Sequence, residues 1–170
     1  MTLCAQPVAT DTARGRGTPT VNPGMPRFPR YLLPDGLFHA TARGAGRIPI
    51  FCDDDDRRTF LALLTWVIHD FRWTCHAFCL MTNHYHLVID ALREDMSNGF
   101  RRLNGLYAQG FNARHGRWGH LFGERFWCRP LEAEEELERT CIYVAENPVR
   151  AGLCAQPSDW PWSGCRFELD

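Results

Sequence analysis

Two apolar segments joined by only two residues constrain the fold of this chain more than any other feature. "WTCHAFCLM" (73–81) and "HYHLVID" (84–90) have the length and the β-branched and aromatic content of strands, and Thr82-Asn83 forms a tight connection between them. Antiparallel strands accept so short a connection, whereas parallel strands need a long crossover. We therefore expect an antiparallel sheet that contains this hairpin.

Further strands and helices flank the hairpin. Hydrophobic periodicity and helix-terminating residues predict strands at 37–44 and within 123–131, and helices at 53–71, 97–115 and 132–147, the last closed by Pro148. The order β-α-β-β-α-β-α indicates one α+β domain over residues 31–170, with a ferredoxin-like split β-α-β sheet and helices packed on it. Residues 1–30 are rich in Pro, Thr, Gly and Ala, which predicts a disordered tail, and Met25 is an alternative translation start to Met1.

Several residues of the predicted helices have structural interpretations. The four aspartates of 53–56 suit an N-cap and the positive end of a helix dipole, an explanation we prefer to a metal cluster. Tyr107 continues an apolar helical stripe and is expected in the core. Gly105 and Gly110 lie inside the same helix, where each costs about 1 kcal/mol relative to alanine. We expect another element to approach the backbone closely at these two glycines.

His84 and His86 are the main candidates for chemistry. Side chains alternate between the two faces of a strand, so both imidazoles point to one face and Tyr85 to the other. Their Cα atoms are about 6.6 Å apart at the usual strand rise, close enough for both rings to bind one ion. A bare H-x-H is more often a pair of hydrogen-bonded core histidines, so further ligands must come from elsewhere.

The last predicted helix offers such ligands, and the cysteines do not. Cys75 and Cys79 are about 13 Å apart along one strand, and the chain has no C-x-x-C, which argues against structural zinc. Tyr143 and Asn147 are four residues apart and share one helical face, flanking its buried seam. Arg139 extends that face by one more turn. Each of these residues also has a purely structural interpretation, because a tyrosine beside a core is common and Asn before Pro often ends a helix.

Charge and cysteine usage indicate where the protein acts and what it contacts. All 19 basic residues are arginine, and the net charge is −1. Six arginines lie between residues 100 and 129 against the single acid Glu124, and arginine binds phosphate through two parallel hydrogen bonds. The eight cysteines show no repeating spacing, and no secretory signal or membrane-length apolar segment is visible. We expect reduced thiols in a cytoplasmic protein.

In combination these motifs resemble a known family. "MTNHYHLVI" resembles the histidine–hydrophobic–histidine (HUH) motif of the IS200/IS605-type Y1 transposases. "YVAENPVRAGL" followed by "PSDWPWSG" resembles the signature of the REP-associated tyrosine transposases, a branch of that family. "RGAGRIPIF" and "YAQGFNARHGRWGHLFGERF" also fit in order, so the resemblance covers about residues 28–165.

The resemblance implies a fold of the HUH endonuclease type and a single-stranded DNA endonuclease and strand transferase. It implies Tyr143 as the nucleophile, with His84, His86 and Asn147 as ligands of Mg²⁺ or Mn²⁺; Tyr107 is the rival nucleophile. Attack would give a 5′-phosphotyrosine and a free 3′-hydroxyl. Arg139 is our own addition, as a cation that eases ionisation of the phenol. The predicted partner is single-stranded or hairpin DNA, contacted by residues in and near the arginine cluster: Arg43, Arg101, Arg102, Arg114, Arg117, Trp118, Arg125 and Arg129.

Two other functions fit the same residues. A protein of this fold could bind hairpins without cleaving them, or His84 and His86 could activate water in an unrelated metal-dependent hydrolase. Neither a membrane partner nor a fixed oligomeric state is predicted, and both a monomer and a homodimer agree with the sequence. Because metal-bound imidazoles must be neutral, activity is expected to fail below about pH 6.

Overall fold

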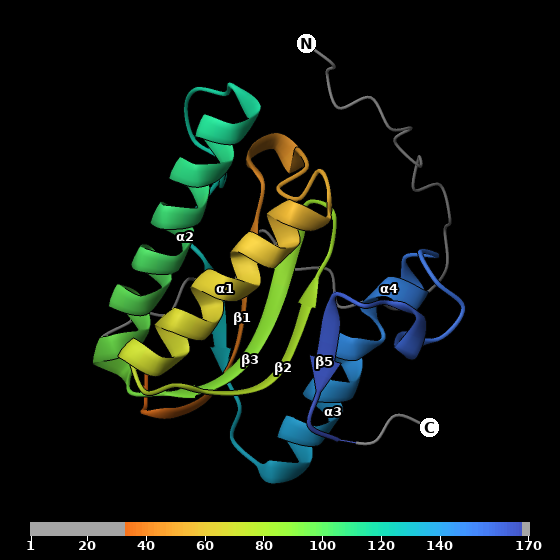
Figure 1. The fold of residues 1–170 in the computed structure, drawn as a ribbon. Coiled ribbons are helices and arrows are strands. Elements are labelled where there is room, and N and C mark those ends of the chain that lie inside the picture. The colour runs from red at the N-terminus through yellow and green to blue at the C-terminus, as the bar shows by residue number, and fades with distance from the viewer. Residues whose placement is uncertain (1–32, 168–170) are drawn as a thin grey trace.

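The computed structural model describes residues 33–167, which form a five-stranded antiparallel sheet flanked by helices (Figure 1). The strands are β1 (Gly36–Arg43), β2 (Thr74–Leu80), β3 (His84–Ala91), β4 (Trp127–Pro130) and β5 (Ser163–Cys165), in the spatial order β4-β1-β3-β2-β5. The expected α+β fold with an antiparallel sheet is confirmed. The expected tail at 1–30 lies outside the described residues.

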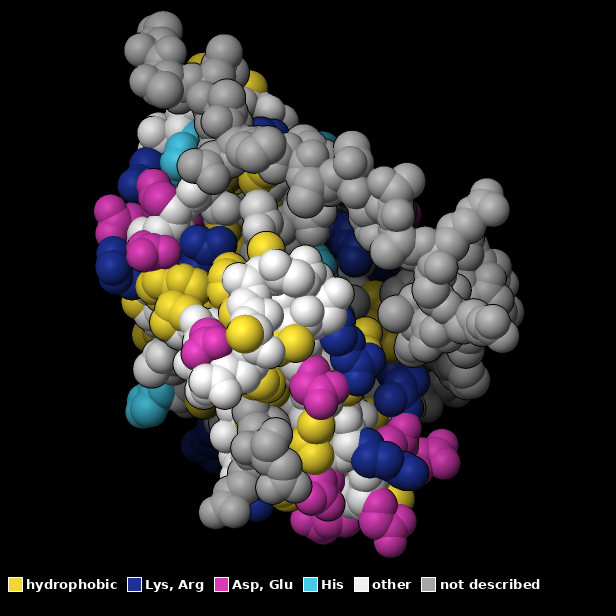
Figure 2. Space-filling model, turned by 90° about the vertical axis from the view of Figure 1, so that its right-hand side faces the viewer, with side chains coloured by type: hydrophobic (Ala, Val, Ile, Leu, Met, Phe, Trp, Pro, Cys, Tyr) yellow, Lys and Arg dark blue, Asp and Glu magenta, His cyan; other side chains and the backbone are white. Residues whose placement is uncertain are grey.

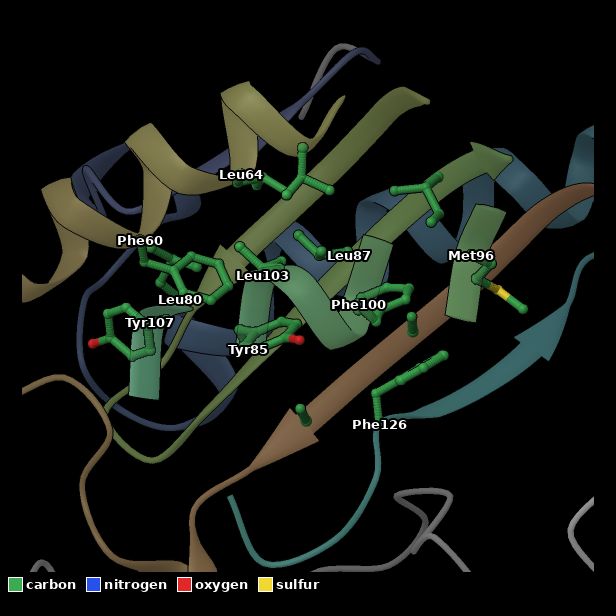
Figure 3. Close-up of a cluster of buried hydrophobic side chains, with 14 of the residues drawn as sticks. Phe60, Leu64, Leu80, Tyr85, Leu87, Met96, Phe100, Leu103, Tyr107 and Phe126 are labelled. Carbon is green, nitrogen blue, oxygen red and sulfur yellow. The ribbon is translucent and has the colours of Figure 1, made fainter. Parts of the chain in front are cut away.

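One face of the sheet is covered by α1 (Asp54–Asp70) and α2 (Arg93–His115). Their apolar side chains meet those of the sheet in the main hydrophobic core, which Figure 3 shows in close-up. Tyr107 lies in this core at 1% exposure and its hydroxyl donates to the carbonyl of Ile50, as expected for a structural tyrosine. Asp53 caps α1 by accepting a hydrogen bond from the backbone N–H of Asp56, so the N-cap interpretation is also confirmed.

The opposite face of the sheet carries α3 (Glu134–Ala145), which packs against β2, β3 and β5. A second, smaller core joins apolar residues of α3 to those of β2 and β3: Ala77, Cys79, Val88, Leu137, Cys141 and Val144. Pro148 was expected to close the last helix. In the structure it belongs to the first turn of a short following helix, α4 (Asn147–Arg150), a position that suits proline because its missing N–H would be unpaired there anyway.

The expectation about the glycines of α2 is wrong. A Cβ added at Gly105 or Gly110 would meet nothing within 4 Å. The close approach occurs instead at Gly99, where a Cβ would overlap the ring of the buried Trp73. Gly99 falls inside α2 because this helix begins at Arg93, four residues before the expected start. Within the described part of the chain, no helix is both long and apolar enough to span a bilayer.

Candidate functional site

His84 and His86 lie on β3 and point to the face of the sheet that α3 covers. Their neighbours Tyr85 and Leu87 point the other way, into the main core. The two imidazole ring centroids are 5.0 Å apart with nearly perpendicular planes. Two rings at this distance from adjacent same-face positions can direct one nitrogen each toward a shared ion.

Hydrogen bonds fix which nitrogen each histidine presents. The Nδ1 atom of His84 lies 2.7 Å from Oδ1 of Asn83, and Nδ1 of His86 lies 3.0 Å from Nε2 of His39. Asn83 Oδ1 only accepts, so His84 carries its proton on Nδ1. Both rings therefore use Nδ1 within the protein, and among the described residues neither Nε2 atom has a hydrogen-bond partner. A neutral imidazole binds a metal through its unprotonated nitrogen, so this arrangement fits a metal pair.

Burial keeps these imidazoles neutral. Desolvation and the nearby Arg43 lower the pKa of His84 to about 4. Desolvation, followed by the charges of His39 and His84, lowers the pKa of His86 well below its ordinary value. Desolvation and Arg129 lower the pKa of His39 to about 4. Because the pKa of each of the three rings is lowered, they stay neutral to a lower pH than free histidine, and we expect activity to persist below the pH of about 6 that the sequence alone suggested.

Tyr143 comes to this site from α3. Its ring centroid is 6.2 Å from that of His86 and 6.3 Å from that of His39, with the rings edge to face in both pairs. The side chain is partly exposed, in contrast to the fully buried Tyr85 and Tyr107. The predicted juxtaposition of the α3 tyrosine and the sheet histidines is therefore present.

Two arginines flank Tyr143, and neither is the one that the sequence suggested. The Arg150 guanidinium carbon lies 4.9 Å from the centroid of the Tyr143 ring, and Arg150 also pairs with Glu146 at 2.6 Å. Desolvation and Arg47 lower the pKa of Arg43, whereas Tyr143 raises it, so the phenol is within electrostatic range of Arg43. Arg139 is exposed, and its Nε donates to the carbonyl of Glu135 one turn back along α3.

Asn147 lies one turn beyond Tyr143. Its amide nitrogen donates to the carbonyls of Tyr143 at 2.9 Å and of Val144 at 3.3 Å. This use of the nitrogen leaves Oδ1 as the atom for other partners, and an amide oxygen suits a hard divalent cation. Two imidazole Nε2 atoms and one amide oxygen are therefore the atoms of the predicted ligands that are left without a partner among the described residues.

The remaining predicted DNA contacts divide into two groups. Arg114 binds Asp53, Asp55 and Asp56, and Arg129 pairs with Glu136, so acids already engage both. The others are held less strongly: Arg101 against Asn98, Arg102 over the Trp66 ring, Arg117 over the Phe111 ring, and Arg125 in an exposed position. Trp118 is 94% exposed. Arg101 and Arg125 line a cavity of about 620 Å³ between α2 and residues 120–126.

The molecular surface on the side of α3 and α4 carries both basic and acidic side chains. Figure 2 shows several arginine side chains across the middle and right of this face, with acidic side chains beside them and at the lower edge. The acidic first turn of α3, Glu134 to Glu136, follows the rule that carboxylates favour helix N-termini.

A second group of possible metal ligands lies away from the histidines. Ligand atoms of Cys52, Asp56 and His115 are all within 4.8 Å of one another. Asp56 accepts hydrogen bonds from the Cys52 backbone N–H at 2.8 Å and from Arg114 at 2.5 Å, and also contacts His115 at 2.9 Å. A bound cation here would compete with the Arg114 guanidinium for the same carboxylate. The group therefore ties α1 to the end of α2.

Sequence reasoning missed His39 and Arg150. His39 had a usable signal, because in the segment 37–44 it alternates with Phe38 and Ala40 and so belongs to the face opposite the core. Arg150 had none, since its position depends on the short helix that Pro148 begins.

The antiparallel split β-α-β sheet, with an H-x-H pair beside a helical tyrosine, agrees with the HUH endonuclease type of fold that the sequence resemblance implied. Comparison with protein families makes this more specific: residues 35–147 match the model described as "Transposase IS200 like". The chain belongs to the IS200-like transposase family. No protein with curated function matches the sequence significantly.

Two solved structures resemble the protein. One is a REP-associated tyrosine transposase bound to a REP hairpin, with 21% sequence identity, a TM-score of 0.66 and coverage of 82% of each chain. It has the same fold. The other, a protein of Deinococcus radiodurans R1 named as a transposase, is 13% identical with a TM-score of 0.47, and the match covers 61% of this chain and 85% of that one.

Proposed function

We propose that the protein is a metal-dependent single-stranded DNA endonuclease and strand transferase that uses Tyr143 as its nucleophile and acts at hairpin-forming repeats. The observation that carries this proposal is the position of the Tyr143 ring, 6.2 Å from the centroid of His86 on the shared face of the sheet. A partly exposed phenol beside two neutral imidazoles is an arrangement for attack on a phosphate that a metal ion holds.

In this proposal His84 and His86 hold the ion through Nε2, and Asn147 through Oδ1. A bound Mg²⁺ or Mn²⁺ supplies positive charge that polarises the phosphate and stabilises the departing oxygen. The hydrogen bonds from Nδ1 of both histidines keep the rings in the required tautomer, and the hydrogen bonds of the Asn147 nitrogen leave its oxygen available as a ligand.

Tyr143 performs the covalent step. The phenol loses its proton to solvent and its oxygen bonds to phosphorus, while the bond from phosphorus to the 3′ oxygen breaks. The departing oxygen takes a proton from solvent and becomes a 3′-hydroxyl. A phenol with a pKa near 10 is about one part in a thousand ionised at pH 7, so ionisation needs help. Arg150 over the ring and Arg43 nearby place positive charge where the phenolate forms. Another 3′-hydroxyl can reverse the reaction and join DNA.

The proposed DNA path runs from Tyr143 past Arg43 to the cavity beside α2. The carbonyl of Arg43 accepts a hydrogen bond from the N–H of Gly123, which lines that cavity together with Arg101 and Arg125. Exposed Trp118 lies in the segment that follows α2 and suits stacking on an unpaired base. Hairpin DNA as the substrate is supported by the REP hairpin in the structural relative.

A covalent adduct tests the proposal. The protein is incubated with Mn²⁺ and end-labelled single-stranded oligonucleotides that carry hairpins of varied stem and flanking sequence, and the products are separated in SDS. We expect a labelled band that survives SDS, requires Mn²⁺ and is absent in Tyr143→Phe. Tyr107→Phe is the matched control, because Tyr107 is the rival tyrosine but lies buried in the core.

The outcomes separate the three functions. Hairpin binding without an adduct across the whole set of oligonucleotides would leave a non-cleaving DNA-binding protein. Cleavage without an adduct, unaffected by Tyr143→Phe, would point to hydrolysis by activated water. Both results contradict the proposal.

A further inference from the structure

We propose that His39 is a positioning residue for the metal site, which holds His86 in the tautomer and orientation that direct its Nε2 atom to the ion. The inference rests on the proposed function, because it assigns a role toward the same ion. It adds a residue of β1 to the proposed metal-binding residues, which so far come from β3 and from Asn147 at the start of α4.

The sheet register brings His39 to the site. β1 pairs with β3 so that Thr41 lies opposite His86 and Arg43 opposite His84. His39 is one same-face position further along β1, and its ring stacks on that of His86 with centroids 5.2 Å apart and planes 22° apart. Its Nε2 atom is 3.0 Å from Nδ1 of His86, a hydrogen-bonding distance, and both rings are 8% exposed.

Surrounding rings hold His39 in this orientation. The indole of Trp127 on β4 meets it edge to face at 5.7 Å, and Tyr143 does the same at 6.3 Å. The neighbouring Arg129 is a cation, which disfavours a second proton on the ring. A neutral His39 whose Nε2 is unprotonated accepts the hydrogen bond from Nδ1–H of His86.

The hydrogen bond that His39 accepts determines which nitrogen of His86 can bind a metal ion. When Nδ1 holds the proton, Nε2 keeps its lone pair for a metal; with the proton on Nε2, the ring cannot bind one. Asn83 performs the same task for His84 through its carbonyl oxygen. The two ligands thus have separate orienting partners, one an amide within the β2–β3 turn and the other an imidazole on the adjacent strand. Such partners typically change metal affinity 10–100-fold when removed.

Three variants test the role. His39→Leu removes the acceptor, whereas His39→Gln restores an acceptor oxygen near the position of Nε2. The matched control is His76→Leu, because His76 is also a histidine with 8% exposure in the sheet but bonds Arg166 rather than a ligand of the site. Mn²⁺ affinity of the DNA-free protein is measured by electron paramagnetic resonance, and folding of each variant by thermal unfolding.

We expect Mn²⁺ affinity to fall about 10–100-fold in His39→Leu, to recover most of that loss in His39→Gln, and to stay unchanged in His76→Leu. Long-range proton–nitrogen NMR correlations of the metal-free wild type should show His86 protonated on Nδ1. His86 protonated on Nε2 would overturn the inference, even if the leucine variant does not fold. Wild-type affinity in a folded His39→Leu, or no recovery in His39→Gln, would also overturn it.

The same measurements distinguish failure of the inference from failure of the proposed function. Wild-type protein that binds Mn²⁺, loses it in His86→Ala and keeps it in His39→Leu refutes only the role of His39. Wild-type protein that shows the Nδ1 tautomer of His86 but binds no Mn²⁺ refutes the metal site of the proposed function and leaves the orienting contact in place.

Discussion

The buried imidazoles should make the metal-free protein lose stability as the pH falls through the range in which free histidine gains a proton. In the folded protein the pKa of His39 is about 4, against 6.5 for a free histidine. The unfolded chain therefore binds the proton more readily, and the free energy of unfolding falls from about pH 6.5 down to about pH 4, where the folded protein binds it too.

The magnitude follows from the same values. Protonation of His39 stabilises the unfolded chain by about 1.4 kcal/mol for each pH unit below 6.5. At pH 5, roughly 1.5 units below that value, the free energy of unfolding is therefore about 2 kcal/mol lower, because the folded ring is still neutral. At pH 7 this term is only a few tenths of a kcal/mol. His39→Gln cannot titrate, and it also removes the charge of His39 that contributes to lowering the pKa of His86. The variant should therefore lose about 2 kcal/mol less than the wild type between pH 7 and pH 5.

Urea unfolding followed by tryptophan fluorescence, in EDTA at pH 7 and pH 5, measures the difference between the two proteins. Thr41→Val is the control, because Thr41 neighbours His39 on the same face of β1 but does not titrate. It should show the wild-type pH dependence. Equal losses of stability in His39→Gln and the wild type would refute the reasoning that His39 is buried and neutral.

Three further results are expected. Gly99→Ala should lower the free energy of unfolding in urea by about 1–3 kcal/mol, because its Cβ would overlap the Trp73 ring. Gly105→Ala, on an open helix surface, should raise it by up to about 1 kcal/mol. Equal effects of the two substitutions would refute the packing of Gly99 against Trp73. Arg150→Leu should slow adduct formation about 3–30-fold, the equivalent of about 0.5–2 kcal/mol, with hairpin affinity unchanged; an unchanged rate would remove this role. Trp118→Ala should weaken binding of DNA with unpaired bases by about 1–3 kcal/mol without changing Tm; unchanged binding would exclude stacking.

Most helices and strands could be predicted because each is determined by residues that are close together in the sequence. The hairpin at 73–90, the capped helix after Asp53 and the stripe through Tyr107 each depend on residues close together in the sequence. β5 was missed because its three residues are too few for a periodic pattern and form a strand only by pairing with β2. The glycine error has a similar cause, since the partner of α2 at Gly99 is Trp73, far away in sequence.

The site was predictable in part for the same reason. Strand alternation places His84 beside His86, and helical spacing places Asn147 one turn after Tyr143. Joining the two pairs required a family resemblance, because spacing within one element does not say which elements meet. His39 shows this limit most clearly. Its face was readable from the alternation of 37–44, but its contact with His86 depends on the register of β1 against β3.

Locating the covalent bond tests the central claim most directly. Trypsin cleaves this lysine-free chain only after arginine, and its four tyrosines then fall on separate peptides. Mass spectrometry of the digested DNA adduct, after nuclease treatment, should find a nucleotide joined through its 5′-phosphate to the peptide 140–150. This peptide contains Tyr143 and no other tyrosine. A nucleotide attached to the peptide of Tyr107, or to any peptide other than 140–150, would contradict the assignment of Tyr143 as the nucleophile.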